Sequence, residues 1–208
     1  MSFSAAERAR LAELMLNLGP DAPTLCEGWD TQDLAVHLYI RENVPTGAAG
    51  IFLPPFKSLL ERAEKKQYAR SFEEVVRDWA AGPQGLSPWR LLDGVANTAE
   101  HFVHLEDVRR GGGVVEPRDF SERVSSELYG ILKMMAKRML AKSPVPVILL
   151  ADGQPPLVVA DSRGVSESGD DVLRISGAVG ELLLWVFGRD AVKVEISGDP
   201  EVLGRKAL

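Results

Sequence analysis

Apolar residues recur at helical intervals through the first half of the chain. Near the N-terminus they repeat every three or four positions, which predicts a helix with an apolar stripe of Leu11, Leu14, Met15 and Leu18. Ser4 and Glu7 have the spacing of a capping box at its start, and Gly19-Pro20 is expected to end it.

A second helix is predicted to begin after Asp30, an N-cap residue, with Asp33 in its first turn and Leu34 and Leu38 on its apolar face. The stretch 43–55 is rich in proline and glycine, which disfavour a regular helix. We therefore expect a long crossover there.

Four further helical patterns follow this crossover. They share apolar stripes at helical spacing and lie at 56–69, 72–81, 88–110 and 119–140. The second begins with a capping box of Ser71 and Glu74, and the third is ended by three consecutive glycines at 111–113. Residues 1–142 thus supply about four long antiparallel helices with shorter pieces, the content of a helical bundle.

After residue 143 the pattern changes to β-branched runs separated by Gly, Asp and Ser. Strands are predicted at 144–151, 156–161, 172–177 and 192–198, with a helix at 180–189 between the last two. This β-β-β-α-β order predicts a small second domain over residues 143–208, so we expect the chain to be of the α+β class.

Composition narrows the classes of function. The formal charge of −6, with both signs interspersed, disfavours a nucleic-acid-binding surface, and the basic run at 133–142 is typical of the solvated face of a helix. No apolar run reaches the roughly 20 residues of a membrane span. With one cysteine and no N-terminal apolar segment, we expect a cytoplasmic protein.

Two of the three histidines lie in the predicted helix 88–110, within NTAEHFVHLEDVRR. Residues four apart share a helix face, so Glu100 and His104 can converge on one point, and Asp107 extends the same stripe. His101 is rotated by about 100° from Glu100. A pair of His101 with His104 at i,i+3 stays possible.

A metal centre is one interpretation of this stripe. Two imidazoles and a carboxylate suit zinc or a similar divalent metal, in a site that leaves one position open. His37, in the predicted second helix, is the remaining histidine and would supply the third ligand. The alternative is that these are ordinary polar side chains, since a Glu-x-x-x-His pair alone is a weak motif. Asp107 either pairs with Arg110 or Arg41, or orients a ligand imidazole.

Other candidate groups have simpler interpretations. Cys26 could be a nucleophile or a ligand, but no histidine is near it in sequence, and a small buried residue is the favoured interpretation. The glycines at 111–113 lack the frame of a phosphate-binding loop. The tryptophans could line a ligand cavity, although core packing is the default for each of Trp29, Trp79, Trp89 and Trp185.

Three segments together resemble a known family. They are CEGWDTQDLAVHL (26–38), NTAEHFVHLEDVRR (97–110) and GELLLWVFGR (180–189). In this order they resemble the mycothiol-dependent maleylpyruvate isomerase family, which belongs to the DinB-like metalloprotein superfamily. The resemblance implies a DinB-like four-helix bundle over residues 1–142, followed by a small α+β domain similar to sterol-carrier proteins over 143–208.

The resemblance also implies a site and its chemistry. The family's metal ligands correspond to His37, Glu100 and His104, while His101 falls outside the pattern. A divalent metal, with zinc expected, and the small thiol mycothiol are the implied cofactors, and actinobacterial origin is implied as well. A thiolate that adds to a conjugated double bond permits cis–trans isomerisation, whereas attack on an electrophile without return is S-transfer.

The resemblance leaves the substrate open, and a small electrophile is expected. Arg174 and Arg189 could bind a carboxylate substrate or the cofactor, although a surface or ion-paired role is the simpler interpretation of each. A non-catalytic metal-binding or small-molecule-binding protein is the alternative function, and a regulatory partner of a sigma factor is a third. The expected partners are a small thiol and a small-molecule substrate, with neither nucleic acid nor membrane.

Overall fold

The computed structural model describes residues 2–83, 95–161, 164 and 172–203. The chain divides into two compact units, Met1–Val114 and Val115–Leu208. It is an α+β protein, as predicted. Among the described residues, no helix combines the length and the apolar character needed to cross a membrane.

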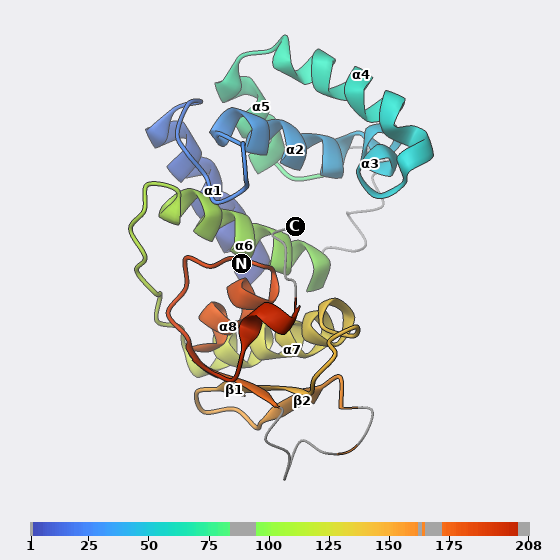
Figure 1. Ribbon diagram of the computed structural model, residues 1–208. Helices are drawn as coiled ribbons and strands as arrows, with labels where there is room; N and C mark the ends of the chain where they lie inside the picture. The colour runs from blue at the N-terminus through green and yellow to red at the C-terminus, as the bar shows by residue number, and fades with distance from the viewer. Residues whose placement is uncertain (1, 84–94, 162–163, 165–171, 204–208) are drawn as a thin grey trace. The chain divides into compact units, whose positions relative to one another are not determined.

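The N-terminal unit consists of helices (Figure 1). In chain order they are α1 (Phe3–Leu18), α2 (Thr31–Asn43), α3 (Pro45–Phe52), the short 3-10 helix η1 (Pro54–Phe56), α4 (Lys57–Tyr68), α5 (Phe72–Ala80) and α6 (Val95–Arg110). Packing pairs α1 with α6 and α2 with α5. These four helices share one buried core, which includes Leu11, Leu34, Trp79 and Leu105. They form a four-helix bundle, as predicted, but the short helix α5 is a full member and the helix expected at 119–140 is not.

Local capping explains where several helices begin. Asp30 and Asp33 form a complete capping box at the start of α2, and the box predicted for α5 is also present. The box predicted at Ser4 is wrong, because α1 begins at Phe3 with Ser2 as its N-cap and Ser4 is buried within the unit. The predicted start of the helix at 88 lies outside the described residues.

The expected crossover at 43–55 contains a regular helix, α3, so this prediction is wrong. Pro45 occupies the first turn, where its missing N–H costs no helical hydrogen bond. Gly47 allows close packing, because a Cβ there would lie 2.8 Å from Ile40 Cγ2 and 2.9 Å from the Ala63 Cβ. The proline and glycine that disfavoured a helix by propensity are thus compatible with it by position and packing.

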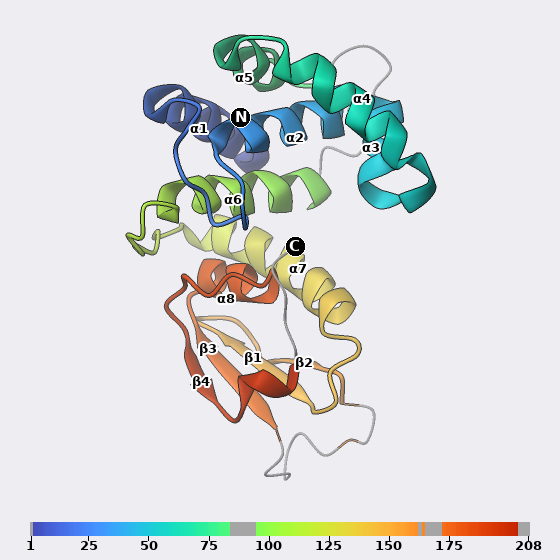
Figure 2. The same ribbon diagram turned by 45° about the horizontal axis from the view of Figure 1, so that its top comes forward.

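The C-terminal unit combines two helices with one sheet. Its elements are α7 (Glu122–Met139), β1 (Val147–Ala151), β2 (Leu157–Val159), β3 (Leu173–Gly177), α8 (Val179–Val186), β4 (Glu195–Ser197) and the short helix η3 (Pro200–Leu203). The strand order is β2-β1-β3-β4, with β1 parallel to β3 and the other two pairs antiparallel. Figure 2 shows α8 against this sheet, with α7 packed on α8. From β1 onward the order is the predicted β-β-β-α-β.

α7 belongs with the sheet rather than with the bundle. The two compact units divide between Val114 and Val115, whereas the sequence pattern places a domain boundary between 142 and 143. That predicted boundary follows the change from helices to strands. α7 packs on α8 and has Leu128 and Leu132 buried. The second unit therefore begins with a helix, α7, and not with the first strand.

Candidate metal centre

α6 presents three polar side chains along one face. The Nε2 atom of His104 lies 3.3 Å from Oε2 of Glu100, one helical turn before it. The Nδ1 atom of His104 lies 2.9 Å from Oδ2 of Asp107. The spacing of these residues in sequence therefore sets His104 between two carboxylates.

α2 brings His37 to the same place. The centroids of the His37 and His104 rings are 5.7 Å apart. His37, Glu100 and His104 each offer a ligand atom, and these atoms all lie within 4.8 Å of one another. We call these three residues the candidate metal cluster. Zinc bonds of about 2.1 Å separate tetrahedral ligand atoms by roughly 3.4 Å, so small side-chain rotations would fit this donor set to a divalent metal.

Burial and neighbouring charges set the protonation of the cluster. Burial, followed by repulsion from His104, lowers the pKa of His37 to about 4. Burial acts to raise the pKa of Glu100, but the hydrogen bond and charge of His104 outweigh it and lower this pKa to about 2. Burial acts to lower the pKa of His104, but hydrogen bonds, first among them that to Asp107, raise it well above its usual value. Near neutral pH, His37 and Glu100 are thus already in their metal-binding forms.

Arg41 is a buried cation beside the cluster. Its Nε atom lies 3.5 Å from Oε2 of Glu100, and its Nη1 donates to Oδ1 of Asn97 at 3.0 Å. Arg41 was one of two partners considered for Asp107 from the sequence, and in the structure it pairs with Glu100. The sequence contains a clue to this contact: Arg41 lies four residues after His37, so both side chains are on one face of α2.

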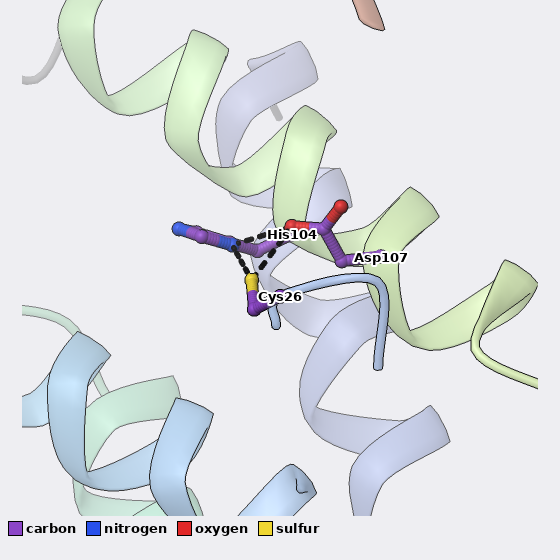
Figure 3. A group of neighbouring side chains, drawn as sticks. All are labelled: Cys26, His104 and Asp107. Atoms are coloured by element: carbon purple, nitrogen blue, oxygen red, sulfur yellow. Dashed lines mark hydrogen bonds and ion pairs between the residues drawn. The ribbon is translucent and has the colours of Figure 1, made fainter. Parts of the chain in front are cut away.

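The loop before α2 brings Cys26 close to His104 and Asp107 (Figure 3). Cys26 Sγ lies 3.3 Å from Asp107 Oδ2 and 3.9 Å from His104 Nδ1. The three side chains form a second group whose ligand atoms all lie within 4.8 Å. Cys26 is buried, as favoured by the sequence. Its contact with His104 could not be predicted, because the two residues are 78 positions apart and no local pattern links them.

His101 lies in a separate buried network on α6. Its Nε2 atom is 3.0 Å from Oε1 of Glu42, which also accepts a hydrogen bond from Nε1 of Trp79 at 2.9 Å. Glu42 Oε2 forms an ion pair with Arg8 at 2.7 Å. The network links α1, α2, α5 and α6. The structure thus groups His101 with Glu42 rather than with the candidate metal cluster.

A cavity of about 480 Å³ lies beside His37, which forms part of its wall. Val36, Ile51 and Lys57 are among the other lining residues. Trp29 also lines it, with its ring centroid 5.1 Å from that of His37. Because His37 belongs to both the wall and the cluster, a molecule in this cavity would touch a member of the candidate metal cluster.

The remaining candidates have different surroundings. Trp79 and Trp185 are buried, as expected for core residues, and Trp89 lies outside the described residues. Arg189 is buried and donates to a backbone carbonyl through Nη1. Arg174 is half-buried in β3. A substrate-binding role for either arginine stays a prediction.

Comparison with known proteins identifies the fold. No protein-family model matches this sequence, and no curated protein sequence matches it. Among solved structures, the chain is similar to the mycothiol-dependent maleylpyruvate isomerase, with a TM-score of 0.61, 14% identity, and coverage of 94% of this chain and 90% of that chain. A histidine-to-alanine mutant of the isomerase matches with a TM-score of 0.56 and the same 14% identity. The family resemblance seen in the sequence is confirmed at the level of fold: this chain has the fold of the mycothiol-dependent maleylpyruvate isomerase.

Proposed function

We propose that this protein is a divalent-metal-dependent enzyme that uses a small thiol, mycothiol in the first instance, for isomerisation or S-transfer of a small electrophile. The observation that carries the proposal is the convergence of His37, Glu100 and His104 beside a cavity. Two imidazoles and a carboxylate form a donor set found in catalytic zinc sites, which leave a fourth position for an exchangeable ligand. The fold shared with a thiol-dependent isomerase supports the same class of chemistry.

The side chains around the cluster would hold the ligands in defined orientations. Asp107 accepts the Nδ1–H of His104, which would turn the Nε2 atom of that ring toward the cluster, where a bound metal would displace its proton. Arg41 lies against the Glu100 carboxylate and adds to the larger effect of His104, which lowers the pKa of Glu100. A bound divalent ion would supply Lewis acidity that keeps a thiol in its thiolate form near neutral pH.

The cavity beside His37 could hold the thiol or the electrophile. Val36, Ile51 and Leu60 contribute apolar surface, which would limit the access of water to reacting atoms. The charged part of the lining is mixed, with Lys57 opposed by the carboxylates of Asp33 and Glu64. A small electrophile with an apolar part is therefore the proposed class of substrate.

The metal is tested first, by mass spectrometry on protein purified without a histidine tag. We expect about one divalent ion per chain in the wild type, retained in His101→Gln and lost in His104→Ala. The His101 variant is a matched control, because it removes the same side chain three positions away and outside the cluster. Full metal content in folded His104→Ala would contradict the assignment of His104 as a ligand.

The thiol is tested on cobalt-substituted protein carrying Cys26→Ser, so that any thiolate signal comes from added thiol. Mycothiol should produce a thiolate-to-cobalt charge-transfer band, and turnover of small conjugated electrophiles would then be measured. Stoichiometric cobalt with no response to mycothiol, and no turnover, would favour the alternative of a non-catalytic metal-binding protein.

A further inference from the structure

The loop that carries Cys26 is tied to its neighbours through the backbone. The amide of Cys26 donates to Thr24 Oγ1 at 3.1 Å, and its carbonyl accepts from the amide of Trp29 at 3.0 Å. The amide of Leu25 donates to the carbonyl of Asp107 at 3.1 Å, which joins the loop to α6. The position of the Cys26 thiol relative to the Asp107 side chain is therefore held by a backbone contact between the same two segments.

The Cys26 thiol donates to the same Asp107 oxygen that accepts a hydrogen bond from His104. Asp107 Oδ2 lies 3.3 Å from Cys26 Sγ and 2.9 Å from His104 Nδ1. Asp107 has no exposed surface, and a buried carboxylate needs hydrogen-bond donors to offset its lost hydration. Since the carboxylate can only accept, the thiol S–H is the donor. Two donors on one oxygen restrict the rotation of the carboxylate about its own axis.

We propose that Cys26 is a positioning residue of the candidate metal centre: its hydrogen bond holds the Asp107 carboxylate that orients His104. This inference rests on the proposed function. Loss of the thiol would leave Asp107 freer to rotate, and the imidazole of His104 would then be less firmly directed at the metal. Partners of metal-ligating residues typically change metal affinity by about 10–100-fold when they are removed.

The test compares Cys26→Ala with Cys26→Ser. Alanine removes the sulfur atom, whereas serine replaces it with a smaller oxygen that keeps a hydrogen-bond donor. Zinc affinity is measured by competition with a chromophoric chelator, and urea unfolding of the metal-free proteins is measured alongside to separate affinity from folding. We expect Cys26→Ala to bind zinc about tenfold more weakly than the wild type, and Cys26→Ser to recover most of that loss.

Three outcomes would overturn the inference. Wild-type affinity in Cys26→Ala would show that the thiol does not position the site, and equal weakening in both variants would reduce its role to packing. A thiolate-to-cobalt band in cobalt-substituted wild-type protein before any thiol is added would make Cys26 a direct ligand. Absence of zinc binding by the wild type is a distinct result, because it would refute the proposed metal centre and this inference with it.

Discussion

Replacement of Glu42 by glutamine tests whether one buried network holds together the helices that carry the candidate metal cluster. Glu42, on α2, is fully buried and contacts His101 on α6, Trp79 on α5 and Arg8 on α1. The cluster itself is carried by α2 and α6. Glutamine keeps the size of the side chain but removes its charge and turns one acceptor into a donor, at a point where several donors converge.

The expected loss of stability follows from these contacts. Removal of one partner of a buried ion pair costs about 3–5 kcal/mol, because the other charge stays buried without its partner. Glutamine retains one acceptor oxygen, so we expect a loss near the lower end, about 3 kcal/mol. At about 2–4 °C per kcal/mol for a chain of this length, the melting temperature should fall by roughly 6–12 °C.

The effect should depend on pH with a defined sign. Burial acts to raise the pKa of Glu42, but the hydrogen bond with His101 and the charge of Arg8 outweigh it, so the pKa lies below its usual value of 4.5. A carboxylate with a lowered folded-state pKa contributes stability above its unfolded-state pKa, and this stability is lost as the pH falls through the folded-state pKa. The stability difference between wild type and Glu42→Gln should therefore be complete near pH 7 and shrink below about pH 5.

The assay is urea unfolding of the metal-free proteins by circular dichroism, at pH 7 and at pH 4. Glu61→Gln is the control, since Glu61 lies on α4 with 60% of its side chain exposed and a distant 3.9 Å contact to Lys57. Its free energy of unfolding should change by less than about 1 kcal/mol. Equal stability of Glu42→Gln and wild type at pH 7, or a difference that is the same at both pH values, would refute the reasoning.

Two further changes probe the site and the loop beside it. Asp107→Asn should weaken zinc binding by about 10–100-fold in chelator competition, because the amide can turn an N–H toward His104; unchanged affinity would exclude an orienting role for Asp107. Gly111→Ala should lower the free energy of unfolding by about 1–3 kcal/mol, because its Cβ would lie 1.9 Å from the Pro23 carbonyl oxygen. Gly112→Ala, with nothing within 4 Å, should be near neutral, and equal unfolding energies for the two glycine variants would contradict this packing argument.

Local sequence signals predicted most elements correctly, because capping and periodicity depend on residues a few positions apart. The N-cap at Asp30, the capping box of Ser71 and Glu74, and the β-β-β-α-β order are examples. Helix α3 was not predicted, because Gly47 is there to allow close packing against Ile40 and Ala63 on neighbouring helices. Propensity describes an isolated segment and contains no information about such neighbours.

In the candidate site, too, contacts within one helix could be predicted from the sequence, whereas contacts between helices could not. The positions of Glu100 and Asp107 on either side of His104 follow from helical spacing alone. His37 could be named from the sequence only through the expected bundle and the family resemblance. Its approach to His104 is a property of how α2 and α6 pack.

The sequence by itself determined most of the helices, the β-β-β-α-β succession of elements after residue 143 and the acidic stripe around His104, because each depends on residues that are close together along the chain. Only the tertiary structure decided that His101 joins Glu42, 59 positions away, and that Cys26 reaches Asp107, 81 positions away. It also decided that α7 packs with the sheet. These contacts depend on which buried surfaces meet when the chain folds, and sequence periodicity identifies such surfaces without specifying their partners.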